Sequence, residues 1–299
     1  MSRYSIREVQ QWGQTYIDRA EVDILIAHVL KVKKEFSITH PEYKISKLKY
    51  YKIKHLISKR TKGIPIAYLT GHKEFFGLDF LVNKHTLIPR PETELMVEAV
   101  RKMFPPLLGE GQGRVESKKN IILIDAGTGS GCIPISILKS FNLQSSILTY
   151  GIDISKKALK IANKNAKKHN VDIALLHGNL LEPIIKTSSL PLVPCSLIIT
   201  ANLPYLTQEQ FNGESSIQHE PITALVTDDG GLFLYKKLLE QIKELLTTYH
   251  LPLTTFFEID PSQTKQLSNH IQNIFPKAQM SVHKDGMGND RMVKIHITH

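Results

Sequence analysis

From residue 121 the chain has the sequence Ile121-Ile122-Leu123-Ile124-Asp125-Ala126-Gly127-Thr128-Gly129-Ser130-Gly131. Its first five residues form a short apolar run ending in an acid, which predicts a strand buried in a parallel sheet. The glycines allow a sharp turn and a close approach to a ligand, and a helix predicted over 132–140 would offer free N–H groups at its start. Strand, glycine loop and helix together predict the start of a Rossmann-like unit.

The spacing of the loop glycines indicates the kind of ligand. G-x-G-x-G differs from the G-x-G-x-x-G of dinucleotide enzymes, which disfavours a pyrophosphate. Asp153 ends the next apolar run about twenty residues beyond the loop, where a carboxylate can accept ribose hydroxyls. We therefore expect an adenosyl ligand without phosphates, S-adenosylmethionine. The predicted cofactor-binding residues are Asp125, Gly127, Thr128, Gly129, Ser130, Gly131, Asp153, Asn179, Leu180 and Asn202.

Further strands and helices alternate downstream. Asn179 and Leu180 follow the strand predicted near 173–176, in a turn that we expect to flank the adenine, although an ordinary βα loop fits the same residues. Such repeated units, closed by a pair of terminal strands, predict an α/β protein with a mostly parallel sheet and an antiparallel edge. The other expected strands are 197–201, 256–259 and 291–297, and the expected helices start at Ser155 and cover 232–248 and 261–274.

The part of the chain before this sheet has a different pattern. Two apolar stripes at helical spacing, separated by Pro41, predict a small helical domain, and 75–82 has the composition of a β-hairpin. The polar, glycine-containing stretch between 105 and 120 predicts a surface loop. We expect a helical domain over residues 1–70, a hairpin linker over 71–90 and an α/β domain over 91–299.

Composition limits the possible classes of protein. The longest apolar runs are too short for a membrane span, and the chain starts without an apolar leader, so we expect a soluble protein of the cytoplasm. The two cysteines lack CxxC spacing and are expected to be buried thiols. The thirteen histidines show no ligand spacing, so no metal is expected. A net charge of +10 favours an acidic partner and leaves direct nucleic-acid binding open, although lysine-rich helix faces are usually only solvated.

Asn202-Leu203-Pro204-Tyr205 directly follows the strand predicted over 197–201, at the sheet edge where ligands bind. An amide, a stiff backbone and an aromatic ring suit a flat conjugated NH2 group, since two carbonyl oxygens can accept its hydrogens while the ring covers its face. A simple strand followed by a turn would explain the tetrapeptide alone. We predict all four residues to be catalytic, with Leu203 contributing only its carbonyl.

A second turn contains two prolines, in Ile88-Pro89-Arg90-Pro91-Glu92-Thr93-Glu94. The prolines disfavour a helix before Pro91, so this turn presents Arg90 and Glu92 on a stiff backbone at a helix start. A capped turn without further function is the alternative. The predicted substrate-binding residues are Arg90, Pro91, Glu92, Asn202, Leu203, Pro204 and Tyr205.

Together these motifs resemble the HemK/PrmC-type methyltransferases, which modify the glutamine side chain of peptide chain release factors at its amide nitrogen. The resemblance covers nearly the whole chain and is closest from Ile64 onward. It implies a class I methyltransferase sheet, S-adenosylmethionine as cofactor, a substrate-docking role for the helical domain, and the glutamine of the Gly-Gly-Gln loop as substrate; we expect a monomer. The motifs that carry it are Tyr68-Leu69-Thr70-Gly71, Glu74-Phe75-Phe76-Gly77-Leu78, 88–94, 125–131, Glu220-Pro221 with Ala224-Leu225, and Asn289-Asp290-Arg291.

Two positions depart from the family pattern. Leu203 stands where the family usually has proline, and Asn179 stands where an acid usually follows the third strand. Asn-Leu-Pro-Tyr also resembles the motif of adenine-N6 methyltransferases that act on ribosomal RNA, so an RNA or DNA adenine methyltransferase is the alternative enzyme. A basic RNA-binding or assembly factor with a relic cofactor fold is the alternative without catalysis.

Overall fold

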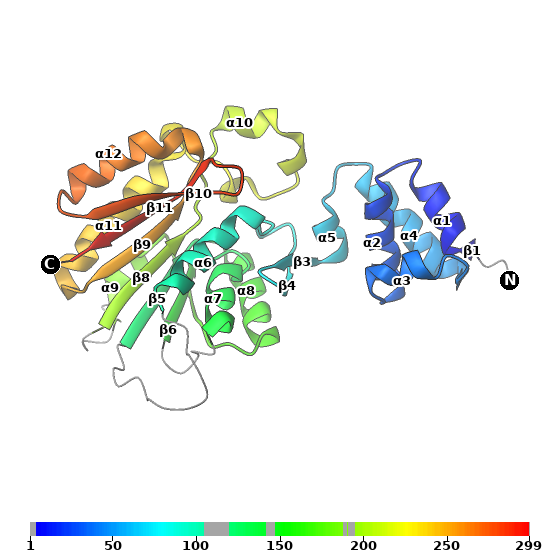
Figure 1. The fold of residues 1–299 in the computed structure, drawn as a ribbon, viewed down its shortest axis with the longest axis horizontal. Helices are drawn as coiled ribbons and strands as arrows, with labels where there is room; N and C mark the ends of the chain where they lie inside the picture. Colours follow the sequence, from blue (N-terminus) through cyan, green and yellow to red (C-terminus); the bar gives the residue numbers. More distant parts are fainter. Residues whose placement is uncertain (1–3, 105–119, 142–146, 188–189, 191–194, 299) are drawn as a thin grey trace. The chain divides into compact units, whose positions relative to one another are not determined.

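The computed structural model describes residues 4–104, 120–141, 147–187, 190 and 195–298. Residues 105–119 of the expected surface loop therefore lie outside the described part. The contacts of the chain divide it into two compact units (Figure 1). The first contains Met1–His72 and Glu214–His219, and the second contains Lys73–Gly213 and Glu220–His299.

The first unit is mostly helical, as predicted, with one small sheet that the sequence did not indicate. Its core is apolar and includes Ile6, Val22, Ile26 and Ile53, all fully buried. Its elements are β1 (Tyr4–Ser5), α1 (Ile6–Gly13), α2 (Arg19–Leu30), α3 (Lys34–Thr39), β2 (Lys44–Ile45), α4 (Lys47–Arg60) and α5 (Ile66–Thr70), and 3-10 turn η2 (Ser215–Ile217) also belongs to this unit. The two strands pair antiparallel.

The predicted hairpin is present as β3 (His72–Phe75) and β4 (Leu78–Leu81). Its turn residues, Phe76 and Gly77, both have positive φ, which suits a tight hairpin turn. The predicted proline turn follows as the 3-10 turn η1 (Pro91–Thr93), which leads into α6 (Glu94–Lys102). Glu94 accepts a hydrogen bond from the Phe76 N–H at 2.8 Å, so the hairpin and α6 are joined.

The second unit contains a seven-stranded sheet in the order β10-β11-β9-β8-β5-β6-β7. The pairs from β9 to β7 are parallel, and β11 pairs antiparallel with both β9 and β10, which confirms the predicted antiparallel edge. The strands are β5 (Asn120–Ala126), β6 (Ile147–Asp153), β7 (Ala174–His177), β8 (Cys195–Ala201), β9 (Leu253–Glu258), β10 (Gln279–Lys284) and β11 (Asp290–Ile297).

Helices cover both faces of this sheet (Figure 1). Side chains alternate along β5: Ile122 and Ile124 pack into the core that includes α11 residues, whereas Leu123 packs into the core that includes residues of α6 and α7. The remaining elements are α7 (Cys132–Phe141), α8 (Lys156–Lys168), α9 (Glu182–Thr187), α10 (Gln208–Gly213), η3 (Ile222–Ala224), η4 (Asp229–Gly231), α11 (Phe233–Tyr249), η5 (Pro261–Gln263) and α12 (Thr264–Ile274). Within the described residues, no helix is long and apolar enough to cross a membrane.

Candidate active site

The strand order changes direction between β5 and β8, because the chain proceeds from β5 to β6 and β7 on one side and returns to β8 on the other. Open α/β sheets bind ligands at such a switch point, beyond the carboxyl ends of the strands. A cavity of about 550 Å³ lies there and is lined by residues that follow β5, β6, β7 and β8. Its size falls in the range of roughly 300–1,000 Å³ that is usual for small-molecule sites.

The glycine loop after β5 forms one wall of this cavity. The N–H groups of Gly127 and Thr128 donate to the Ile152 carbonyl of β6 at 2.8 and 2.9 Å, which fixes the loop to the neighbouring strand. Gly127 has φ of +78°, and a Cβ there would lie 3.0 Å from the Leu203 side chain. This position therefore requires glycine both for its backbone conformation and for the close approach of the two loops.

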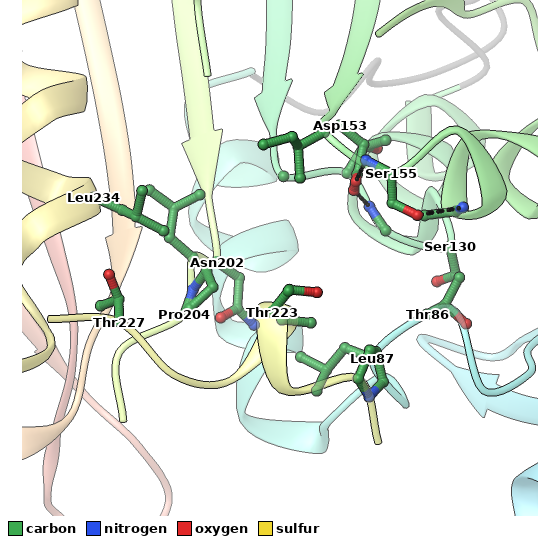
Figure 2. A pocket seen from close by; sticks show the side chains of 18 of the residues that line it. Thr86, Leu87, Ser130, Asp153, Ser155, Asn202, Pro204, Thr223, Thr227 and Leu234 are labelled. Carbon is green, nitrogen blue, oxygen red and sulfur yellow. Dashed lines mark hydrogen bonds between the residues drawn. The ribbon is translucent and has the colours of Figure 1, made fainter. Parts of the chain in front are cut away.

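Asp153 lies at the end of β6 and faces the cavity together with Ser155 (Figure 2). Its two carboxylate oxygens accept hydrogen bonds from the Gly129 N–H at 2.8 Å and from the Ser155 N–H at 2.7 Å. Burial raises the pKa of Asp153, while these two backbone hydrogen bonds oppose the rise. Each oxygen still has a lone pair for a hydroxyl ligand.

Asp125 has a different position from the one predicted. It is fully buried and does not line the cavity; its Oδ1 accepts a hydrogen bond from Thr200 at 2.7 Å. Burial raises the pKa of Asp125 to about 6, and the hydrogen bond from Thr200 opposes the rise. The carboxyl group therefore bonds to the neighbouring strand β8 rather than facing the ligand space.

The tetrapeptide from Asn202 begins directly after β8, as predicted, and Figure 2 shows Asn202 and Pro204 across the cavity from Asp153. The Leu203 N–H, which a proline would lack, donates to the Tyr235 hydroxyl at 3.2 Å. Tyr235 is fully buried and donates in turn to the Glu258 carbonyl. The extra backbone donor that leucine brings is thus satisfied, and the substitution leaves no unpaired N–H.

Leu203 also contributes its side chain, which the sequence did not indicate. That side chain is 3% exposed, lines the cavity and approaches the glycine loop at Gly127. The expectation that Leu203 contributes only its carbonyl was therefore incomplete. Tyr205, by contrast, is not one of the residues that line the cavity; its carbonyl accepts a hydrogen bond from Gln263 at 2.8 Å, and burial raises the pKa of its phenol.

Arg90 of the proline turn reaches the cavity and forms an ion pair with Glu220. Glu220 is 5% exposed, and its other carboxylate oxygen accepts a hydrogen bond from the Ile88 N–H at 2.9 Å. One buried carboxylate therefore holds both the side chain of Arg90 and the backbone before it. A charged pair in a buried setting fixes geometry more than it adds stability.

The structure brings most of the predicted site residues to one cavity, but not all of them. Pro91 and Glu92 are exposed beside it, and Gly131 lies behind it, where a Cβ would come within 3.3 Å of Ala162. The predicted residues that line the cavity are Arg90, Gly127, Thr128, Gly129, Ser130, Asp153, Asn179, Leu180, Asn202, Leu203 and Pro204. Within the described residues, no group of three or more His, Cys, Asp or Glu side chains could hold a metal ion.

The backbone of Gly231 lies close to the Tyr205 carbonyl and to Gln263, and replacing this glycine with alanine should destabilise the second unit. It has φ of +84°, and a Cβ would lie 2.0 Å from the Tyr205 carbonyl oxygen and 2.2 Å from Gln263 Nε2. We expect Gly231→Ala to lower the free energy of unfolding by about 2 kcal/mol, measured by urea denaturation. Gly230→Ala is the matched control, since Gly230 also has positive φ but nothing lies within 4 Å of its Cβ position. An equal loss in the two variants would contradict the proposed clash.

Comparison with known proteins agrees with this geometry. Residues 10–71 match the family model described as the PrmC N-terminal domain, and residues 117–273 match the one described as a methyltransferase domain. The release factor glutamine methyltransferase of Bacillus cereus is 31% identical over 297 residues, which cover 96% of this chain and 98% of that protein. The chain belongs to the release factor glutamine methyltransferase family. The protein of the same name from Flavobacterium psychrophilum is 32% identical, with 99% of this chain and 98% of that protein covered.

Solved structures of lower identity share the fold of this family member. The catalytic domain of hMettl16 in complex with MAT2A 3′UTR hairpin 1 has a TM-score of 0.55 at 15% identity and covers 91% of this chain and 90% of that one. Such a likeness shows the class I methyltransferase fold alone. The family membership confirms the predicted resemblance, and the chain is an S-adenosylmethionine-dependent methyltransferase.

The cavity of this methyltransferase fits an adenosyl cofactor. The Asp153 carboxylate lies on one wall, where it can accept ribose hydroxyls, and the apolar side chains of Ile133, Ala158 and Leu180 provide surfaces for a flat base. Leu180 is 6% exposed and has φ of +55°, so the backbone after β7 holds it in an uncommon conformation at the wall. Asn179 lies beside it, and its amide can both donate and accept.

Sequence reasoning missed two buried residues next to Asn202. The Asn202 side chain donates from Nδ2 to the Thr93 hydroxyl at 3.0 Å, and burial raises the pKa of the nearby Glu258 carboxyl group to about 7. Thr93 and Glu258 are each 2% exposed. A signal for Glu258 was present, because it ends the apolar run of β9 as Asp153 ends that of β6. No comparable pattern marked Thr93. It lies in the 88–94 motif, where the substrate-binding prediction was made for Arg90, Pro91 and Glu92 instead.

Proposed function

We propose that this chain transfers a methyl group from S-adenosylmethionine to the side-chain amide nitrogen of the glutamine in the Gly-Gly-Gln loop of peptide chain release factors. The single observation that supports this substrate most strongly is the position of the Asn202 amide. Its nitrogen donates to Thr93, and the side chain lies across the cavity from Asp153, the residue expected to bind the cofactor ribose. Full-length similarity to proteins named release factor glutamine methyltransferase supports the same substrate.

The chemical problem is the weak nucleophilicity of an amide nitrogen, whose lone pair is delocalised into its carbonyl. We assign the Asn202 Oδ1 atom and the Leu203 carbonyl oxygen as acceptors for the two N–H groups of the substrate. Two such acceptors fix the orientation of the nitrogen, and well-oriented reactions can gain roughly 7 to 11 kcal/mol over free encounter. The same oxygens stabilise the positive charge that develops on the nitrogen. Bound S-adenosylmethionine supplies the electrophilic methyl group.

The other predicted residues take supporting roles in this proposal. Asp153 accepts the ribose hydroxyls, and Asn179 and Leu180 flank the adenine. Arg90, held by Glu220, lies at the cavity wall where it can contact the substrate backbone. Tyr205 does not line the cavity, and its carbonyl, which accepts a hydrogen bond from Gln263, fixes the end of the tetrapeptide loop. The helical N-terminal domain docks the release factor.

Mass spectrometry after incubation with S-adenosylmethionine tests the proposed substrate. A release factor should gain one methyl group on the glutamine of its Gly-Gly-Gln loop, and a variant release factor with alanine in place of that glutamine should gain none. Bare ribosomal RNA in a parallel reaction tests the adenine-N6 alternative. Methylated adenine without methylated glutamine would refute the release factor assignment, and methyl transfer to neither would favour the non-catalytic alternative.

A further inference from the structure

Leu203 stands where the family usually has proline, at a point where the direction of the backbone matters. Its carbonyl oxygen is one of the two acceptors proposed for the substrate NH2 group. Two backbone torsions of Leu203, φ and ψ, set the direction of that carbonyl. Pro204 restricts ψ, because the residue before a proline is largely confined to extended conformations. A proline at 203 would also fix φ at about −65°, whereas leucine has no ring, so other contacts must fix φ.

The first of these contacts is made by the N–H of Leu203. It donates to the Tyr235 hydroxyl at 3.2 Å. Leu203 is 3% exposed and Tyr235 is fully buried, so water does not compete for this bond. Because an amide N–H lies in the plane of its peptide group, the bond holds the plane of the peptide group that precedes Leu203.

The second contact is made by the side chain of Leu203. This side chain packs against the glycine loop, where a Cβ at Gly127 would lie only 3.0 Å from Leu203 Cδ2. The torsion φ relates the preceding peptide plane to the direction of the side chain, so holding both of them leaves one value of φ. One hydrogen bond and one packing contact therefore replace the ring of a proline.

Tyr235 is itself fixed to the sheet. It lies near the start of α11, and its hydroxyl donates to the backbone carbonyl of Glu258, at the end of β9. A phenol has one hydrogen, so the lone pairs that remain on its oxygen can only accept, and an N–H is the partner that they suit. The ring also packs against Phe257, with the ring centroids 5.3 Å apart. Tyr235 does not line the cavity, so any effect on the reaction passes through Leu203.

We propose that Tyr235 is a positioning residue, whose hydroxyl holds the Leu203 N–H and so directs the Leu203 carbonyl toward the methyl acceptor. In this chain the contact takes the place of the proline that stiffens the tetrapeptide elsewhere in the family. The inference rests on the proposed role of the Leu203 carbonyl in methyl transfer. It adds that this role depends on a buried tyrosine that touches neither substrate nor cofactor.

Tyr235→Phe removes the hydroxyl and keeps the ring. We expect kcat for release factor methylation to fall about 10-fold, because the buried Leu203 N–H loses its partner and φ is no longer fixed. The Kd for S-adenosylmethionine should stay within about 2-fold, since the Asp153 wall is unchanged. Tyr249→Phe is the matched control, because Tyr249 lies on the same helix and its hydroxyl accepts the Leu190 N–H at 3.4 Å. That variant should keep kcat within about 2-fold of wild type.

A double-mutant cycle with Leu203→Pro separates positioning from a general loss of structure. Proline has no N–H to hold and fixes φ by its ring, so adding Tyr235→Phe to Leu203→Pro should lower kcat by less than about 2-fold. The bond from Tyr235 to the Glu258 carbonyl is lost in both backgrounds, and its effect therefore cancels in the comparison. Equal fold-losses in the two backgrounds would overturn the inference, as would a folded Tyr235→Phe enzyme with wild-type kcat.

A third variant decides the matter if Tyr235→Phe does not fold by circular dichroism. Leu203→Ala keeps the N–H but loses the packing contact with the glycine loop, so φ should be less well fixed than in Leu203→Pro. We expect a lower kcat for Leu203→Ala than for Leu203→Pro. An equal or higher kcat for Leu203→Ala would overturn the inference.

Amide exchange tests the same contact without any methyl acceptor. In protein labelled with 15N at leucine, the backbone signal that is lost in Leu203→Pro belongs to Leu203. Its exchange with deuterium should be slow in wild type and in Tyr249→Phe, and at least about 10-fold faster in Tyr235→Phe. If wild type methylates no release factor but this signal responds as expected, the substrate is wrong and the positioning contact stands. Fast exchange in wild type, or an unchanged rate in Tyr235→Phe, would overturn the inference.

Discussion

Replacing Asn202 with alanine should lower kcat for release factor methylation by at least about 10³-fold, because one of the two acceptors that orient the substrate nitrogen is lost. The Kd for S-adenosylmethionine should change by less than about 5-fold, since the Asp153 wall of the cavity is intact. Single-turnover methylation with labelled cofactor measures the first quantity, and isothermal titration calorimetry measures the second.

The controls for Asn202→Ala separate chemistry from folding. Asn163 lies on the exposed side of α8, so Asn163→Ala should retain full activity. Asn202→Asp keeps the size of the side chain and replaces the NH2 group that Thr93 holds with a second acceptor oxygen, so it should retain more activity than Asn202→Ala. Turnover of Asn202→Ala within about 10-fold of wild type would contradict the assignment of Asn202 as the principal acceptor.

The sheet edge and most of its site residues could be predicted because each follows a local pattern. The glycine loop, Asp153 and Asn202 stand directly after apolar runs, and parallel strands bring their carboxyl ends to the same edge. The family resemblance then supplied the substrate, which no periodicity could have indicated. Leu203, by contrast, was assigned from its backbone alone, because nothing local showed that its side chain would approach Gly127.

The contacts that position the site residues could not be predicted, since they join segments that are distant in the sequence. Thr93 and Asn202 meet only because η1 is placed against the end of β8, and Tyr235 meets Leu203 only because α11 covers that face of the sheet. The burial of Asp125 is a similar case. An acidic residue at the end of a strand has the same sequence pattern whether its carboxylate faces a ligand or is buried against a neighbouring strand. Only the packing of Thr200 against it distinguishes the two.

Replacing Asp153 with alanine should weaken S-adenosylmethionine binding by about 100-fold, or about 2.7 kcal/mol. The variant loses the acceptors for the ribose hydroxyls and also the bridge between the Gly129 and Ser155 N–H groups, which joins the glycine loop to the start of α8. Calorimetry measures the affinity. At saturating cofactor kcat should be much less affected, because the acceptors on Asn202 and Leu203 are unchanged.

The pH dependence of cofactor binding provides a second check on Asp153. Burial raises the pKa of its carboxyl group, and protonation removes acceptor capacity, so affinity should be highest above that pKa and should fall as the pH is lowered through it. Asp153→Asn keeps one acceptor oxygen and cannot titrate, so its weaker affinity should lose this pH dependence. Asp172→Ala, at an exposed position before β7, is the matched control and should bind like wild type. If Asp153→Ala binds the cofactor with unchanged affinity, the ribose lies elsewhere in the cavity, and the wall formed by Asn179 and Leu180 becomes its nearest alternative.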